Sequence, residues 1–214
     1  MNNKYQIDLL IYSTSIEDYS NLENSNKVIL NQKILSNNID NDNLEYPMIF
    51  KLSSSSKFGK YETFVSVHDF TACNNKIYVP YHIAETLLID RNDYVNIEIY
   101  IPPKGNYIKL KPKQKEFYNI LDIKDFLSVH IQKYYQVIIK GSILKFPYRD
   151  MIIELIIIDC KPFDVIVTSD TDISVEFEPF TENNKKSEIK NKPYNKKSEK
   201  WYPFCGLGNR LGHK

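Results

Sequence analysis

The sequence is poor in glycine and cysteine, and these shortages exclude several kinds of site. Only six of the 214 residues are glycine, and three of these lie among the last eleven residues. A phosphate-binding loop, a dinucleotide fingerprint or a nucleophile elbow needs closely spaced glycines, which residues 1–203 do not offer. The cysteines, Cys73, Cys160 and Cys205, are too far apart for a disulfide framework or a zinc motif. The sequence therefore indicates a reducing compartment.

The sequence also has no excess of one charge and no long hydrophobic run. Its formal net charge is +1, so no overall attraction favours nucleic acid or an anionic membrane. The longest apolar run lies within residues 151–158 and has the length of a strand, far short of a membrane span. The run at residues 7–12 contains Asp8 and is too short for a signal peptide. We therefore expect a cytoplasmic and nuclear protein without direct membrane insertion.

Candidate catalytic and metal-ligating residues form no known constellation. The histidines, His68, His82, His130 and His213, do not pair with one another or with Cys, Asp or Glu at a ligand spacing. His130 falls beside the apolar face of a predicted helix, which favours a packed side chain over a metal ligand. Cys160 follows an apolar run and is interpreted as a small core residue. We expect no metal, no cofactor and no enzyme activity, with an active site assembled from distant residues as the alternative.

β-type runs dominate the first half of the sequence. They are short, rich in Ile, Val, Tyr and Phe, and separated by turn-forming residues, which is typical of a barrel or a sandwich. Short helices are expected at residues 32–37 and at residues 81–89, the latter entered through Pro80. The expected strands are residues 7–13, 27–30, 47–52, 61–67, 76–79, 94–101 and 107–110.

The pattern changes after about residue 115. Residues 123–134 place apolar side chains at helical spacing, with Asp122 as the N-cap. Strands are expected at residues 142–146, 151–158, 164–168 and 173–177. The fold class is thus mainly β with α+β: a first domain at residues 1–115, a smaller α+β subdomain at residues 116–180, and a tail at residues 181–214.

Two lysine-rich segments each have two interpretations. Residues 109–115 place four lysines on one face of a strand, which favours a solvated edge strand over a docking site for an acidic partner. Residues 181–200 contain seven lysines and three glutamates without periodicity. This composition favours a disordered linker over a nuclear import or nucleic-acid-binding segment.

The last eleven residues are the most informative part of the sequence for function. Three glycines permit close approach to a partner, and Phe204 and Leu211 are apolar anchors around the donor Arg210. A frayed terminus is the simpler interpretation. Against it, the segment resembles the motif by which adaptors dock on the N-terminal domain of the hexameric AAA ATPase valosin-containing protein. The residues that carry this resemblance are Phe204, Gly206, Gly208, Asn209, Arg210 and Leu211.

The body of the chain carries a second resemblance. Residues 27–30, 46–52 and 77–81, together with Leu87-Leu88, resemble in order and spacing the N-terminal domain of the ubiquitin fusion degradation adaptor family. The Tyr-Pro-Met-Ile-Phe-Lys-Leu stretch at residues 46–52 is the most specific piece. The resemblance implies a double-psi β-barrel followed by an α+β subdomain.

The same resemblance implies a non-catalytic function. The body would bind ubiquitin or polyubiquitin chains, and the tail would recruit the client to the ATPase for extraction and proteasomal degradation. It also implies a partner subunit of the nuclear protein localisation type and recruitment to the cytosolic face of the endoplasmic reticulum. The sequence assigns no ubiquitin-contact residues. The alternatives are an enzyme on a double-psi barrel and a basic-tailed nucleic-acid-binding module.

Overall fold

The computed structural model describes residues 4–11, 17–36, 46–56, 59–90 and 93–180. The chain divides into two units, Met1–Phe180 and Thr181–Lys214. The second unit contains the predicted linker and all six predicted docking residues, so these predictions lie outside the described residues. None of the described helices has the length and apolar composition that a membrane span requires.

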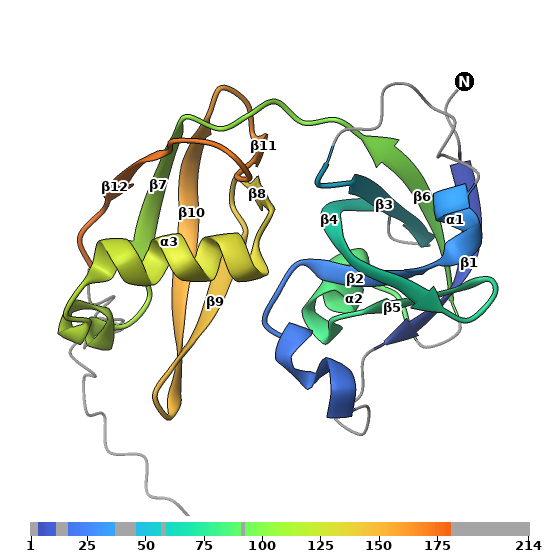
Figure 1. Cartoon of the computed structure of the whole chain (residues 1–214), viewed down its shortest axis with the longest axis horizontal. Coiled ribbons are helices and arrows are strands. Elements are labelled where there is room, and N and C mark those ends of the chain that lie inside the picture. The colour runs from blue at the N-terminus through green and yellow to red at the C-terminus, as the bar shows by residue number, and fades with distance from the viewer. Residues whose placement is uncertain (1–3, 12–16, 37–45, 57–58, 91–92, 181–214) are drawn as a thin grey trace, which may run out of the picture. The chain divides into compact units, whose positions relative to one another are not determined.

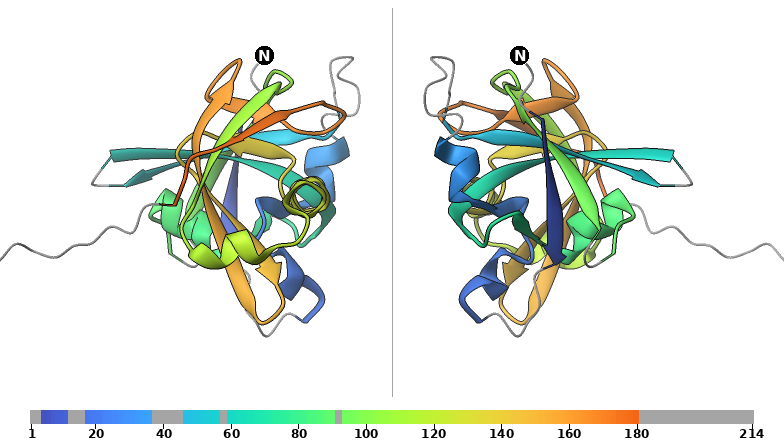
Figure 2. Two further views of the ribbon diagram at one scale, coloured as in Figure 1. Left: turned by 90° about the vertical axis from the view of Figure 1, so that its left-hand side faces the viewer. Right: turned by 90° about the vertical axis from the view of Figure 1, so that its right-hand side faces the viewer.

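The first subdomain is a closed β-barrel (Figure 1). Its strand order is β1-β5-β2-β4-β3-β6, in which β1 pairs in parallel with β5 and β2 in parallel with β4. The distal part of the β3–β4 hairpin projects from the barrel (Figure 2). The strands are β1 (Lys4–Ile11), β2 (Lys27–Asn31), β3 (Ile49–Ser56), β4 (Gly59–Ala72), β5 (Lys76–Val79) and β6 (Tyr94–Tyr100).

Alternating side chains fill the barrel. In β3 and β6, for example, Phe50, Leu52, Val95 and Ile97 are fully buried, as the period of two predicts. Helix α2 (Tyr81–Leu87) follows Pro80 and buries Ile83, Ala84 and Leu87 in the same core. Two further short helices, η1 (Glu17–Leu22) and α1 (Gln32–Ser36), flank β2 in the chain.

The second subdomain is a four-stranded sheet with a helix across one face (Figure 1). Its order is β12-β7-β10-β9, and a separate pair joins β8 to β11. The elements are β7 (Tyr107–Pro112), η2 (Lys115–Asn119), α3 (Ile123–Tyr134), β8 (Val137–Ile139), β9 (Ile143–Tyr148), β10 (Met151–Lys161), β11 (Val165–Val167) and β12 (Ser174–Phe177).

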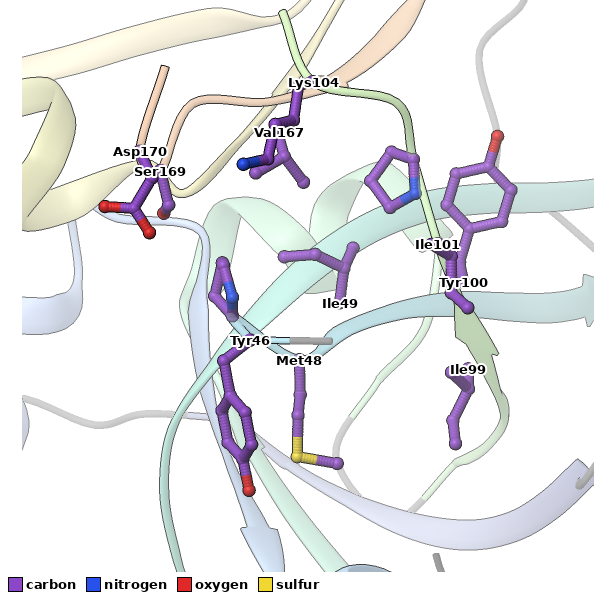
Figure 3. Close-up of a pocket in the computed structure, with 12 residues that line it drawn as sticks. Tyr46, Met48, Ile49, Ile99, Tyr100, Ile101, Lys104, Val167, Ser169 and Asp170 are labelled. Atoms are coloured by element: carbon purple, nitrogen blue, oxygen red, sulfur yellow. The ribbon is translucent and has the colours of Figure 1, made fainter. Parts of the chain in front are cut away.

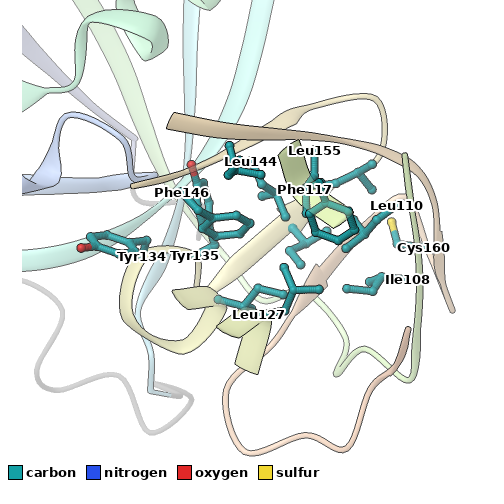
Figure 4. Packing of buried hydrophobic residues seen from close by; sticks show 14 of the residues in the cluster. Ile108, Leu110, Phe117, Leu127, Tyr134, Tyr135, Leu144, Phe146, Leu155 and Cys160 are labelled. Atoms are coloured by element: carbon teal, nitrogen blue, oxygen red, sulfur yellow. The ribbon is translucent and has the colours of Figure 1, made fainter. Parts of the chain in front are cut away.

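A second hydrophobic core lies between α3 and the sheet (Figure 4). Leu127 and Ile131 of α3 pack in one buried cluster with Phe117, Phe146 and Cys160. The Asp122 carboxylate accepts a hydrogen bond from the Asp125 N–H at 3.0 Å, so the predicted N-cap is confirmed.

The structure corrects the expectation of an edge strand for residues 109–115. β7 is an interior strand between β12 and β10, so the predicted edge strand is wrong. The pattern within residues 109–115 could not show that a strand more than 60 residues later would cover that edge. The expected first domain, residues 1–115, therefore includes a strand of the second sheet, and the topology places the division before Tyr107.

Three lysines of this segment have carboxylate partners. The Nζ atoms of Lys109 and Lys111 each lie 2.9 Å from a carboxylate oxygen, of Glu176 and Glu178 respectively, and Lys113 pairs with Glu154. The lysine-bearing face of β7 is thus neutralised by its two neighbouring strands and by the residue that follows β12.

Candidate functional site

The stretch that carries the most specific resemblance lines a small pocket (Figure 3). The pocket has a volume of about 50 Å³ and is lined by residues 46–49, 99–102, 104, 167, 169 and 170. Met48 and Ile49 are buried, whereas Tyr46 is 75% exposed. A volume of this size has room for a few water molecules, but small-molecule sites occupy roughly 300–1,000 Å³. The pocket is therefore a small gap where the two subdomains pack together, and the exposed ring of Tyr46 lies at its rim.

The chain between the two subdomains is hydrogen-bonded beside this pocket. The Gly105 N–H donates to the Val167 carbonyl, and the Val167 N–H donates to the Pro103 carbonyl, each at 2.9 Å. Below it, Ile49 of the barrel forms a buried cluster with Val137 and Val167. Backbone hydrogen bonds and apolar contact together hold the crossover against the second subdomain.

Asn26 forms a polar bridge between the subdomains. Its Nδ2 donates to the Val137 carbonyl at 2.5 Å, and its backbone N–H donates to the Tyr134 carbonyl at 3.3 Å. On the barrel side, the Ser66 hydroxyl donates to Asn26 Oδ1 at 3.5 Å. Asn26 is 7% exposed, and buried polar groups need such partners.

Tyr135 forms a second bridge. Its hydroxyl donates to the Asn24 carbonyl at 2.6 Å and accepts from the Lys145 N–H at 2.7 Å. Burial of the side chain raises the pKa of Tyr135 far above its usual value, so the phenol keeps its proton. Nothing in the sequence around Asn26 or Tyr135 indicates these roles, because both depend on residues about 110 positions away.

Beside these bridges lies a cleft of about 620 Å³ between the subdomains. Its lining is mixed in character: Phe64, Ile83 and Ile143 alternate with charged side chains. The charged and titratable residues that line it are Glu62, His82, Glu85, Tyr135, Lys140 and Lys145.

Besides Tyr135, His82 is a strongly perturbed titratable group of the cleft. Burial lowers the pKa of His82 to about 4, and the nearby Lys145 ammonium acts in the same direction. Burial also raises the pKa of Glu23, whose carboxylate accepts the Tyr81 N–H at 2.8 Å. His82 is therefore neutral at physiological pH, and its surroundings disfavour a charged general acid.

The other residues considered in the sequence have structural roles. The His130 Nδ1 lies 2.7 Å from the Phe126 carbonyl and its ring packs on Phe126 at 4.1 Å, so the predicted packed histidine is confirmed. Cys160 is 4% exposed, and burial raises the pKa of its thiol to about 11, as expected for a core residue. Among the residues that the structure describes, no group of three or more His, Cys, Asp or Glu side chains could hold a metal ion.

The architecture is matched by two family models. The model described as "Ubiquitin fusion degradation protein UFD1, N-terminal subdomain 1" matches residues 1–103, and that of N-terminal subdomain 2 matches residues 104–180. The chain belongs to the ubiquitin fusion degradation protein family. The predicted resemblance is confirmed, and the two models meet within the crossover between β6 and β7.

Several relatives align with most of this chain. Ubiquitin fusion degradation protein 1 of Schizosaccharomyces pombe is 28% identical over 166 residues, which are 76% of this chain and 47% of that protein. The Caenorhabditis elegans homolog is 29% identical over 137 residues, 64% of this chain and 39% of that protein. The human protein named "Ubiquitin recognition factor in ER-associated degradation protein 1" is 24% identical over 180 residues, 82% of this chain and 57% of that protein. The chain thus spans less than two thirds of the length of these relatives.

Proposed function

We propose that this chain is a non-catalytic, ubiquitin-binding adaptor that recruits ubiquitinated clients to a hexameric AAA unfoldase for extraction and proteasomal degradation, including ER-associated degradation. The observation that carries the proposal is the match of both N-terminal subdomain models over residues 1–180. The printed names of the relatives refer to ubiquitin recognition and ER-associated degradation.

The ubiquitin part of the proposal is tested by titrating isotope-labelled ubiquitin with the full chain. A module that recognises ubiquitin through a modest surface is expected to bind weakly, so chemical-shift changes should develop over micromolar to millimolar concentrations. Mono-ubiquitin and ubiquitin chains are titrated in parallel. If neither shows shift changes at millimolar excess, the chain is not a ubiquitin adaptor.

The recruitment part rests on the C-terminal residues. Phe204 and Leu211 would enter apolar pockets on the N-terminal domain of the valosin-containing ATPase, and Gly206 and Gly208 would let the backbone lie close to that surface. Arg210, next to Asn209, would pair with a carboxylate.

Fluorescence polarisation of a peptide covering residues 201–214 tests this docking. Phe204→Ala should cost about 2–4 kcal/mol, or roughly thirty- to a thousand-fold in affinity for the ATPase domain. Gly208→Val should weaken binding through steric overlap, and Arg210→Lys more mildly through loss of the guanidinium geometry. Cys205→Ser, at a variable position of the motif, is the matched control and should bind like the native peptide. Equal binding by the Phe204→Ala peptide would contradict the assignment.

We infer double-psi connectivity for the barrel. The support is the pair of parallel contacts, β1 with β5 and β2 with β4, within an otherwise antiparallel closed sheet. Parallel neighbours need crossover connections, which hairpins alone do not supply. A crystal structure tests the inference, and a barrel in which either pair is antiparallel would exclude it.

We further propose a partner subunit of the nuclear protein localisation type and a location in the cytoplasm and nucleus, with recruitment to the cytosolic face of the endoplasmic reticulum. Family membership supports both. Co-expression with such a subunit followed by size-exclusion chromatography tests the first, and imaging of a tagged chain tests the second. Separate elution of the two proteins, or confinement to another compartment, would contradict them.

A further inference from the structure

A groove of about 690 Å³ with an apolar floor lies within the second subdomain, between α3 and β12. Ile108, Leu127 and Ile131 are at most 8% exposed and form its floor. On the strand side, Val175 is 41% and Phe177 is 37% exposed, although their register partners in β7, Ile108 and Leu110, are fully buried. The inner face of the sheet is therefore covered by α3 over β7 but left open at β12.

β12 is also an edge strand (Figure 1). The N–H groups of Ser174 and Glu178 donate to carbonyls of the β7 segment, at Asn106 and Leu110. Because backbone groups alternate along a strand, the N–H and C=O of Val175 and Phe177 point to the other side. No further strand of the sheet lies on that side among the described residues.

The opposite edge of the same sheet is blocked. In β9, the Tyr135 hydroxyl accepts the outward N–H of Lys145, and Pro147 has no N–H to offer. Natural sheets protect their edges with lysine, proline or covering groups. β12 is short, with the sequence Ser-Val-Glu-Phe, and contains no lysine or proline. The outward N–H groups of Val175 and Phe177 are followed by Pro179, which has none.

The charges along β12 select the kind of strand that fits beside it. Residues 170–178 contain four carboxylates and no lysine or arginine. Glu176 lies on the face opposite the groove, in contact with Tyr107 and Lys109, and Glu178 pairs with Lys111. These contacts lower the pKa of both carboxyl groups, so both are charged at neutral pH. Each of these two carboxylates has one lysine partner on the β7 side, and Asp172 lines the groove itself. Residues 170–178 thus add carboxylates to this edge and no cation of their own.

We propose that β12 accepts an extended segment of a partner protein as a fifth strand, with apolar side chains in the α3–β12 groove and Lys or Arg side chains beside Glu176 and Glu178. The backbone bonds provide affinity, and the alternation of apolar and basic residues provides selectivity. The proposal does not depend on binding of ubiquitin or of the ATPase.

The first test uses the full chain and a labelled probe peptide, Ser-Arg-Leu-Arg-Leu-Arg-Ser, with blocked ends. It should bind, and replacement of both leucines by serine should abolish binding. A peptide with glutamate in place of arginine should bind at least about three-fold more weakly, because it places like charges beside β12. Absence of binding by the arginine peptide at millimolar concentration overturns the proposal.

Backbone methylation of the probe distinguishes strand addition from simple groove packing. One peptide carries N-methyl groups on both leucines and another on all three arginines. In an added strand, only one of these two sets of N–H groups faces β12, so one peptide should lose binding and the other should keep it. Equal effects of the two modifications, in either direction, overturn strand addition. This comparison uses the unmodified protein and does not depend on the folding of a variant.

Substitutions then locate the site. Val175→Lys should weaken binding of the arginine peptide at least about ten-fold, because it places a charge at the apolar side of the edge. Glu178→Gln should weaken it by about two- to five-fold. Val129→Lys, on α3 but outside the groove and 60% exposed in the native chain, is the matched control and should have no effect. If Val129→Lys weakens peptide binding as much as Val175→Lys does, the proposal is overturned. It is also overturned if the full chain forms a dimer that Val175→Lys dissociates, because the edge would then bind a second copy of the chain.

Discussion

Replacing Tyr135 by phenylalanine tests how the two subdomains are held together. The substitution removes one oxygen and leaves the aromatic ring to fill the same space among Phe146 and its neighbours (Figure 4). It therefore creates no large cavity. The Asn24 carbonyl and the Lys145 N–H each lose the partner that the hydroxyl provides, at 2.6 Å and 2.7 Å respectively.

The expected cost follows from these two groups. A buried backbone group without a partner costs about 1–3 kcal/mol, and less when water can reach it. Because both bonds are partly buried, we expect the free energy of unfolding to fall by about 2 kcal/mol in total. Tyr134→Phe is the matched control, since this adjacent tyrosine is similarly buried. Its ring stacks under the Lys133 ammonium, and a phenylalanine ring keeps that contact. It should cost less than about 0.5 kcal/mol.

Urea unfolding followed by circular dichroism measures both variants. Tryptophan fluorescence is unsuitable, because the single tryptophan, Trp201, belongs to the C-terminal unit. Hydrogen exchange measures the effect locally. The Lys145 amide should exchange faster in Tyr135→Phe than in the native chain, and at the native rate in Tyr134→Phe. If the two variants lose the same stability and the Lys145 amide keeps its protection, the hydroxyl does not bridge the subdomains.

Three further predictions concern other parts of the described chain. Because the folded-state pKa of His82 is about 4 and the unfolded value about 6.5, stability should fall as pH drops from 6.5 to 4, by up to about 3 kcal/mol. In His82→Gln, the urea midpoint should change less with pH over this range, and an unchanged pH dependence would contradict the burial argument. The raised pKa of Glu23 has the opposite effect, because it makes the folded state more stable as the pH falls. Gly105→Ala should lower the free energy of unfolding by about 1–3 kcal/mol in urea titrations, because its Cβ would lie 2.5 Å from Ile166 Cδ1, and no loss would refute the tight contact. Cys160 should react with a thiol reagent far more slowly than the exposed Cys73, which mass spectrometry of digests can quantify; similar rates would contradict its burial.

The strands and the long helix could be predicted because their signals are local. The alternation around Phe50 and Leu52, and the helical spacing that ends at Ile131, each follow from one face being buried. The three-residue strand β8 and the helices η1 and η2 were not predicted, since such short segments show little periodicity. The edge position of residues 109–115 was predicted wrongly, because the pairing of this strand with Glu176 and its neighbours is non-local.

The candidate sites divide in the same way. The absence of glycine loops and ligand spacings could be interpreted directly from the sequence, and so could the packed His130. The bridging roles of Asn26 and Tyr135 could not, because each depends on which distant carbonyl the fold places beside it. The docking role of Phe204 and the other C-terminal residues stays a prediction.

The parallel pairing of β12 with β7 also determines how the second subdomain responds to mechanical force. The chain enters this subdomain at the start of β7 and leaves it at the end of β12, and the two strands lie side by side in the same direction. Tension applied between the barrel and the chain after residue 180 therefore pulls the two strands along their axes in opposite directions. The hydrogen bonds between β7 and β12, from Ser174–Asn106 at one end to Glu178–Leu110 at the other, are then loaded together in shear. They are not opened one after another. A chain pulled from its C-terminal side would therefore load this pair of strands before any other pair of the subdomain.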